Sequence, residues 1–147
     1  MGEVYKMTIA GCERELPICP ISDTLDIAGF VMFGDVEITE KTAKALMEKC
    51  PEHDIIVTAE SKGLQLTHVT ARELGQPYYA VARKSKKLYM QDGIGISYGS
   101  SITTGKPQEL FLSLHDVNLL KGKKVGIVDD VISTGASLLG LEALVEK

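Results

Sequence analysis

The 147-residue sequence has no tryptophan, only three phenylalanines and three cysteines, and no long apolar run. Cys12, Cys19 and Cys50 are too few and too widely spaced for a disulfide-built scaffold or a metal site of the CxxC type. We therefore expect reduced thiols and a cytoplasmic location. No segment approaches the roughly 18 apolar residues that a membrane-spanning helix needs, and no apolar signal core follows Met1, so no membrane association is expected.

An excess of positive charge is also missing. The chain carries 16 Lys and Arg residues against 20 Asp and Glu residues, which gives a net charge of -4. Since broad nucleic-acid surfaces are normally basic, we expect no nucleic-acid partner. The 44% apolar and 24% charged residues are typical of a globular protein, and the length is sufficient for one sizeable core. We expect a single domain over residues 1–147.

The hydrophobic pattern indicates an α/β fold. Apolar residues recur at helical spacing before Pro51, short apolar runs alternate with such patterns, and Gly75 ends one of them. A strand, a helix and a strand within about thirty residues form a βαβ unit, which places two parallel strands side by side. The first element we expect is a helix with Thr39 as its N-cap, apolar residues at Ala43, Leu46, Met47 and Cys50, and Pro51 as its stop. The elements that follow it are a strand over 54–58, a helix over 63–74, a strand over 78–82, a strand over 125–128 and a final helix over 136–147.

Two segments lack this regularity. Residues 1–20, with Pro17 and Pro20, are expected to form a leading segment or a short strand. Residues 83–109 begin with basic residues and continue with glycines among serines and threonines, a composition typical of mobile surface segments. We expect them to form a long flexible hairpin arm whose return strand covers 110–114.

The most informative stretch runs from Val125 to Ser137 and reads VGIVDDVISTGAS. An apolar strand ends in Asp129 and Asp130, and a small hydroxyl-rich loop then opens into the last helical pattern. This order suits a sugar phosphate, because acids can hold ring hydroxyls while loop amides and a helix N-terminus hold a phosphate. An ordinary strand followed by a Ser/Thr helix cap is the alternative, but a cap requires neither paired acids nor a run of small residues.

These residues resemble the 5-phosphoribosyl-1-pyrophosphate (PRPP) binding motif of the type I phosphoribosyltransferases, and weaker similarity extends upstream to about Leu16. The resemblance implies an open, mostly parallel α/β sheet flanked by helices, with a flexible hairpin arm and a short N-terminal hood. It also implies that the paired acids hold the ribose hydroxyls, partly through a Mg²⁺ cofactor, while the loop holds the 5-phosphate. The implied PRPP-binding residues are Asp129, Asp130, Ser133, Thr134, Gly135, Ala136 and Ser137, with Asp129 and Asp130 as the metal ligands.

Two further segments resemble the family's pyrophosphate site. One is the loop after the first parallel strand, and the other is the basic cluster after the second. Both would face the crevice of the PRPP loop, because ligands of open α/β sheets sit beyond the carboxyl ends of the strands. A simple turn with a solvated Lys62 and a solvated basic turn are the alternatives. The implied pyrophosphate-binding residues are Glu60, Ser61, Lys62, Gly63, Arg83, Lys84 and Lys87, of which Arg83 and Lys87 would stabilise the departing charge.

The base-binding part and the proton chemistry are less defined. The apolar stretch 27–33 lies where the family builds a hood over the purine, so Phe30 or Phe33 could stack on the base, although core packing is the simpler role for each alone. The arm over 94–104 would close over PRPP and exclude water. No general acid or base is assigned: residues 102–106 lack the Glu that adenine-type relatives often carry, and Ser133 stands where 6-oxopurine enzymes often place an Asp.

The resemblance implies a purine phosphoribosyltransferase that acts on PRPP and a purine base as a homodimer. Adenine is the favoured base, with xanthine or another purine next. The alternative is a catalytically silent PRPP-binding regulatory domain, as in purine-operon regulators of this fold. The family continues after its last helix with at least one further strand, so we expect residues 1–147 to form a phosphoribosyltransferase-like domain without the C-terminal strand or strands.

Overall fold

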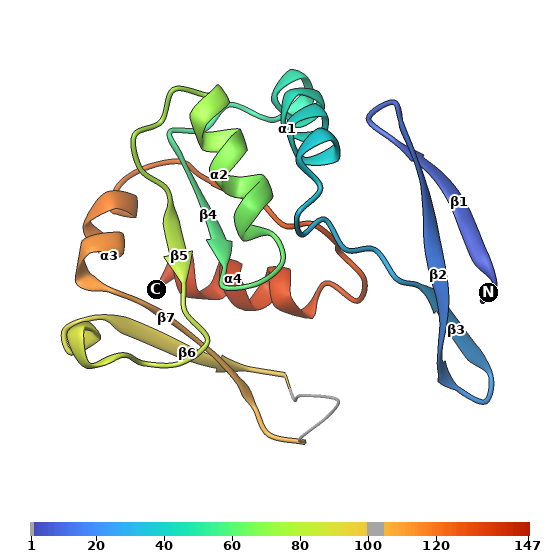
Figure 1. Cartoon of the computed structure of the whole chain (residues 1–147). Helices are drawn as coiled ribbons and strands as arrows, with labels where there is room; N and C mark the ends of the chain where they lie inside the picture. The colour runs from blue at the N-terminus through green and yellow to red at the C-terminus, as the bar shows by residue number, and fades with distance from the viewer. Residues whose placement is uncertain (1, 100–104) are drawn as a thin grey trace.

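A computed structural model of the chain describes residues 2–99 and 105–147 (Figure 1). Strands and helices alternate through most of it, after three N-terminal strands. The elements are β1 (Val4–Ile9), β2 (Cys12–Ser22), β3 (Leu25–Ala28), α1 (Val36–Lys49), β4 (Ile55–Ala59), α2 (Leu64–Glu73), β5 (Ala80–Ala82), a short 3-10 helix (Leu88–Met90), β6 (Ile94–Tyr98), β7 (Gln108–Leu112), α3 (Leu114–Leu120), β8 (Val125–Ile127) and α4 (Ala136–Glu146).

A parallel sheet in the order β5-β4-β8 positions the loops that matter for function. In its register, Val57 of β4 lies opposite Ala80 of β5 and Ile127 of β8. Every residue of β4 is buried, which is typical of a central parallel strand covered on both faces. The predicted βαβ unit is confirmed, because β4 and β5 are parallel and α2 connects them.

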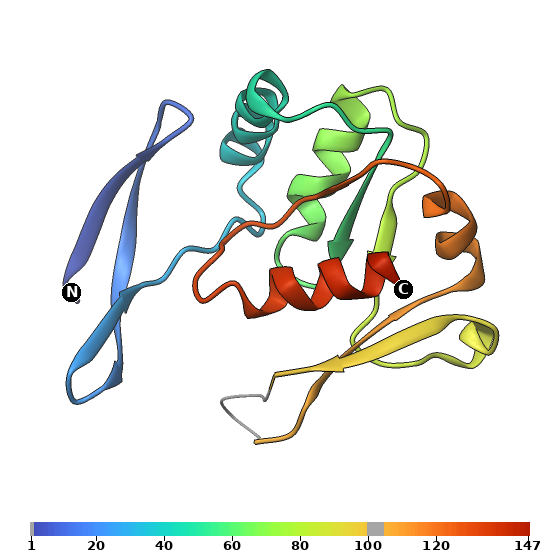
Figure 2. The ribbon, with the colours of Figure 1, turned by 180° about the vertical axis from the view of Figure 1, so that it is seen from behind.

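Helices cover both faces of this sheet. In Figure 1, α1 and α2 lie on the viewer's side, whereas Figure 2, seen from behind, brings α4 to the front. Val57 packs in a buried cluster with Leu141 and Leu144 of α4. Ile38 of α1 and Leu66 of α2 belong to a second, smaller cluster. The expected open parallel α/β architecture is therefore confirmed.

The first helix begins earlier than predicted. Its N-cap is Asp35, not Thr39: the Asp35 carboxylate accepts a hydrogen bond of 3.1 Å from the backbone N–H of Ile38. Thr39 lies within the first turn and is 2% exposed, and its hydroxyl donates to the Asp35 carbonyl over 2.6 Å. Arg14 of β2 also donates to the Asp35 carboxylate over 2.7 Å, so the cap is fixed by a contact from a distant strand.

The prediction of a leading segment or short strand over 1–20 is wrong. β1, β2 and β3 form an antiparallel sheet, in which Tyr5 pairs with Leu16. Pro17 and Pro20 both lie within β2. The strand was not predicted from the sequence because proline is normally confined to the edges and irregular points of sheets. This small sheet lies beside α1, at one end of the molecule (Figure 1).

The predicted hairpin arm is present as β6 and β7, with Ile94 opposite Leu112. The return strand covers Gln108–Leu112 rather than 110–114, because α3 follows at once and Ser113 caps it through a capping box with Asp116. The sequence pattern did not reveal α3. Leu112 is 1% exposed, so the base of the hairpin belongs to the core. The expected hood over 94–104 lies partly outside the described residues, which do not include 100–104.

Two features are absent from residues 2–99 and 105–147. No helix there combines the length and the apolar character needed to cross a bilayer. In the same residues, no group of three or more His, Cys, Asp and Glu side chains is arranged to hold a metal ion. Cys12, Cys19 and Cys50 are free thiols, and Cys12 is buried.

Candidate active site

The segments predicted to bind ligand follow the carboxyl ends of three neighbouring strands. The loop 60–63 follows β4, the basic cluster 83–87 follows β5, and the loop 128–135 follows β8. The strand order β5-β4-β8 therefore places the acid pair and the basic cluster on either side of the central loop. The ends of the strands are also joined by backbone hydrogen bonds, from Glu60 N to the Ala82 carbonyl over 2.8 Å and from Val128 N to the Val57 carbonyl over 3.0 Å.

Asp129 and Asp130 lie together directly after β8. The backbone N–H of Asp130 donates to Asp129 Oδ1 over 2.8 Å. Both residues are only partly exposed. Burial, followed by the side-chain hydrogen bond and the charge of Asp130, raises the pKa of Asp129 from its ordinary value of 3.8 to about 6, although the backbone hydrogen bond from Asp130 lowers it. The positive charge of Lys84 acts in the opposite direction, so this cation lies within electrostatic reach of the acid pair.

Gly63 brings the central loop into contact with the acid pair. A β-carbon on Gly63 would lie 3.0 Å from Asp129 Oδ1 and 3.3 Å from the Asp129 α-carbon. The position therefore favours glycine, because any larger residue would crowd Asp129. The predicted pyrophosphate loop and the predicted PRPP loop touch at this point, as the carboxyl-end rule for parallel sheets requires.

Residues 133–137 form a small concave turn at the start of α4. Gly135 is the N-cap with φ +83°, a left-handed conformation that glycine adopts without strain. The backbone N–H of Ala136 is 3.3 Å from Thr134 Oγ1. A cavity of about 40 Å³ is enclosed by Asp129 and residues 131–138. Backbone amides at such a turn and helix N-terminus suit an anion.

The basic cluster is held in place by Glu60. Arg83 Nε donates to Glu60 Oε2 over 2.8 Å, and the backbone N–H of Lys84 donates to the same oxygen over 3.1 Å. Arg83 Nη1 also donates to the hydroxyl of Tyr89, a residue that the sequence analysis did not single out. The hydrogen bond from Arg83 is the main reason that the pKa of Glu60 lies below its ordinary value. Glu60 therefore keeps its negative charge near neutral pH and anchors the guanidinium.

The remaining predicted cations are less constrained. Lys62 and Lys84 are exposed, and the Lys87 ammonium donates to Ser85 Oγ over 2.7 Å. Ser61 Oγ lies 3.3 Å from the backbone N–H of Gly63, which helps to close the central loop. The predicted pyrophosphate residues are thus brought together around the ends of β4 and β5.

The structure separates the two candidate base-stacking residues. Phe30 is half-buried and packs against the cluster that contains Met32 and Leu66. Phe33 is 57% exposed, so its ring is the more accessible of the two. Val128, directly before the acid pair, packs against the cluster that contains Met32, so the predicted base-binding segment adjoins the predicted PRPP loop.

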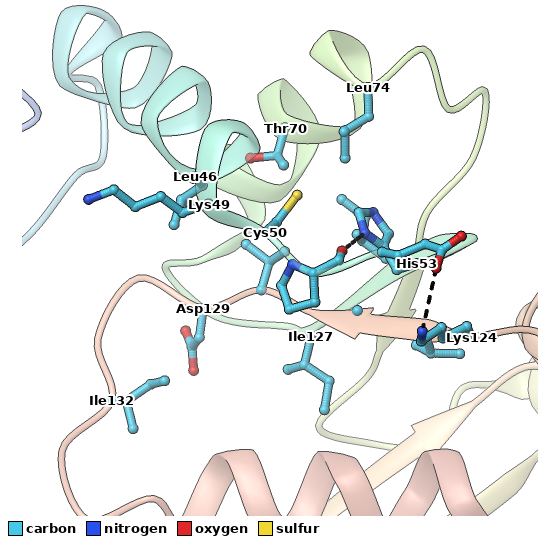
Figure 3. A pocket seen from close by; sticks show the side chains of 16 residues that line it. Leu46, Lys49, Cys50, His53, Thr70, Leu74, Lys124, Ile127, Asp129 and Ile132 are labelled. Atoms are coloured by element: carbon cyan, nitrogen blue, oxygen red, sulfur yellow. Dashed lines mark hydrogen bonds and ion pairs between the residues drawn. The ribbon is translucent and has the colours of Figure 1, made fainter.

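A second, larger cavity of about 580 Å³ runs along the outer edge of β8 (Figure 3). Its walls include Leu46 and Cys50 of the α1 end, Leu74 of the α2 end and Ile127 of β8, and Asp129 lies at its margin. This lining is mostly apolar and has no turn of backbone amides like that at 133–137. The smaller cavity at 131–138 is therefore the better candidate for an anion.

Comparisons with known proteins agree with this arrangement. The family model described as "Phosphoribosyl transferase domain" matches residues 33–147. An adenine phosphoribosyltransferase of Acetivibrio thermocellus is 32% identical over 139 residues, covering 91% of this chain and 76% of that protein. One from Methanococcus maripaludis is 32% identical over 111 residues, covering 74% of this chain and 58% of that protein. A xanthine phosphoribosyltransferase of Exiguobacterium sp. is 38% identical over 93 residues, covering 63% and 47%.

Solved structures support the fold. The adenine phosphoribosyltransferase of Thermoanaerobacter pseudethanolicus has a TM-score of 0.71 at 20% identity and covers 89% of this chain and 75% of its own. That of Rhodothermus marinus has a TM-score of 0.67 at 25% identity and covers 89% and 73%. The chain spans about half to three fifths of the length of the first two curated relatives that it matches by sequence. The family model matches most of this chain, and the relative from Acetivibrio thermocellus is covered over 76% of its own length. The chain therefore belongs to the phosphoribosyl transferase domain family.

Proposed function

We propose that the chain transfers the 5-phosphoribosyl group of PRPP to a purine base, giving a nucleoside monophosphate and pyrophosphate. The observation that carries this proposal is the contact between Gly63 and Asp129, which joins two ligand loops into one crevice with the cations beside Arg83. Adenine is the favoured base and xanthine is next, because relatives with both names match the chain.

PRPP binding would use the two ends of the loop after β8. Carboxylates accept hydrogen bonds from vicinal hydroxyls, so Asp129 and Asp130 suit the ribose. The amides and hydroxyls of 133–137 suit the 5-phosphate, and the N-terminus of α4 adds a favourable dipole.

The acid pair also fits Mg²⁺. This ion prefers oxygen ligands and is commonly bound by one or two carboxylates together with substrate phosphates and water. Asp129 and Asp130 supply such carboxylates, and the described residues offer no third acidic ligand beside them. Bound Mg²⁺ would neutralise part of the negative charge of PRPP. Its requirement is part of this proposal.

In the transfer step, a ring nitrogen of the base donates an electron pair to C1 of the ribose. The C1–O bond breaks, and its electron pair leaves with the pyrophosphate, while the base nitrogen loses its proton to solvent or to a group not yet assigned. Arg83, with Lys84 and Lys87, would stabilise the charge on the departing pyrophosphate. Because Glu60 fixes Arg83 in advance, this guanidinium needs little reorganisation during the reaction.

We also propose that the chain acts as a homodimer in the cytoplasm, without nucleic-acid or membrane partners. The resemblance supports the homodimer, and the absence of an excess of basic residues supports the exclusion of nucleic acid. The relatives named above are transferases, and they give no support to the regulatory alternative.

The test is to incubate the 147-residue chain with PRPP, Mg²⁺ and one base at a time, and to measure pyrophosphate release. We expect release with a purine, fastest with adenine. The variant with Asp129→Asn and Asp130→Asn should lose this release, whereas Asp26→Asn, an exposed residue of β3, should retain it. No release with any purine or pyrimidine would overturn the proposal.

A further inference from the structure

Gln65, near the start of α2, makes several hydrogen bonds to the segment that carries Phe33. Its Nε2 donates to the Met32 carbonyl over 2.6 Å, and its Oε1 accepts from the Gly34 N–H over 3.2 Å. Nε2 also donates to Thr39 Oγ1, whose own hydroxyl donates to the Asp35 carbonyl over 2.6 Å. One side chain thus holds a turn that lies about thirty residues earlier in the chain.

These bonds hold the backbone on both sides of Phe33. The carboxamide pairs with a carbonyl before Phe33 and with an N–H after it, as a neighbouring β-strand would. A backbone hydrogen bond of 2.9 Å from Asp35 N to the Met32 carbonyl closes the same four residues into a turn. Gly34 has φ +78° there, the conformation that the third residue of a type II turn requires.

The result is an exposed aromatic ring on a fixed support. Met32 is 1% exposed and forms the buried side of the turn, whereas Phe33 is 57% exposed on the other side. An exposed side chain held in one backbone conformation loses little further entropy when a ligand packs on it. This geometry favours a contact surface for a flat, partly apolar ligand.

The turn adjoins the proposed ligand crevice. Met32 belongs to the buried cluster that Leu66 of α2 and Val128 also contact, and Val128 precedes Asp129. Gln65 itself lies two positions after Gly63, the residue that touches Asp129. The connection between β3 and α1, which carries the turn, can be followed in Figures 1 and 2.

We propose that Gln65 is a positioning residue for the purine base, which it serves by holding the Phe33 turn so that the ring can stack on the base. This inference rests on the proposed function. Gln65 does not contact the reacting atoms. It acts through Phe33, so its effect should fall on the base and not on PRPP.

The test is to measure steady-state pyrophosphate release for Gln65→Leu with the base and PRPP varied separately. Leucine fills similar volume but cannot pair with Met32, Gly34 or Thr39. We expect the KM for the base to rise about tenfold and the KM for PRPP to stay within about twofold, since only the base would lose a stacking contact with an aromatic ring. The matched control is Gln76→Leu, which removes a half-buried glutamine that bonds to His53, away from the turn, and should leave both KM values unchanged.

A double-variant comparison separates positioning from a general loss of packing. In a Phe33→Ala background, Gln65→Leu should raise the KM for the base no further, because the ring through which Gln65 acts is absent. The inference would be overturned if Gln65→Leu raised the KM for the base by the same factor in the wild type and in the Phe33→Ala background. It would also be overturned if Gln65→Leu raised the KM for the base and the KM for PRPP equally. If the wild type releases pyrophosphate and Gln65→Leu has the same KM for the base as the wild type, this inference alone is overturned. A wild type inactive with every base overturns the proposed function and this inference with it.

Discussion

Replacing Asp129 with asparagine should stabilise the protein at neutral pH while removing its ligand site. Asp129 is half-buried after β8, and its pKa is raised to about 6, first by burial and then by Asp130. Asparagine has nearly the same shape and retains an Oδ1 that can accept the hydrogen bond from the Asp130 N–H. The substitution therefore removes the negative charge and little else.

The magnitude follows from the difference between the folded and the unfolded state. The pKa rises from 3.8 to about 6, and since each pH unit corresponds to about 1.36 kcal/mol, the ionised carboxylate costs at most about 3 kcal/mol of folding free energy. Asp129 is only partly buried, so solvent screens its charge, which reduces the expected value to about 1 kcal/mol.

The effect of the Asp129 charge on the free energy of unfolding depends on pH. Because the folded pKa lies above the unfolded one, the native state binds the proton more tightly, and stability falls as the pH rises from about 4 to about 6. Asp129→Asn does not titrate, so its free energy of unfolding should match the wild type near pH 3.5 and exceed it by about 1 kcal/mol at pH 7.5.

Urea denaturation of both proteins, without PRPP or Mg²⁺, measures this difference at several pH values, and titrating groups that do not interact with Asp129 cancel in the comparison. Asp26→Asn, an exposed acid in β3, is the control and should show no such pH-dependent gain. A difference between Asp129→Asn and the wild type that is constant with pH, or a variant that is less stable at pH 7.5, would refute the reasoning.

Three further changes test other contacts. Gly140→Ala would place a β-carbon 2.6 Å from the Tyr98 ring, so urea denaturation should show a loss of about 1–3 kcal/mol; unchanged stability would mean that α4 and β6 are not in contact. Gly63→Ala would place a β-carbon 3.0 Å from the Asp129 carboxylate. Calorimetric titration should then show an affinity for PRPP that is reduced about tenfold, or by about 1.4 kcal/mol. An affinity equal to that of the wild type would argue against the contact between the loops. Glu60→Gln removes the ion pair that fixes Arg83, so kcat for pyrophosphate release should fall at least about tenfold, and an unchanged kcat would show that Arg83 needs no anchor.

The sequence was sufficient for the central sheet and for the loops at its carboxyl ends. The short apolar runs before Glu60 and Asp129 predicted buried strands, and burial of all of β4 shows why the pattern was so clear. The segment 129–137 could be proposed as a ligand loop because its acids, hydroxyls and glycine stand in one continuous stretch that resembles the family's PRPP motif.

Contacts between distant segments could not be predicted in this way. Gln65 lies within an ordinary helical pattern, and nothing local shows that its carboxamide reaches the turn around Phe33. The pairing of Glu60 with Arg83 joins residues on two different strands, so it follows from the sheet order and not from either segment alone. The N-terminal sheet was missed for a related reason: its strands are stabilised by pairing with each other, while prolines disrupt their local pattern.

A crystal structure of the chain with PRPP and Mg²⁺ tests the central claim most directly. We predict density for the ribose hydroxyls at the carboxylates of Asp129 and Asp130, for the 5-phosphate at the amides of 133–137, and for the pyrophosphate between Gly63 and Arg83. PRPP bound elsewhere, such as in the apolar cavity along β8, or no binding at saturating concentration, would contradict the account.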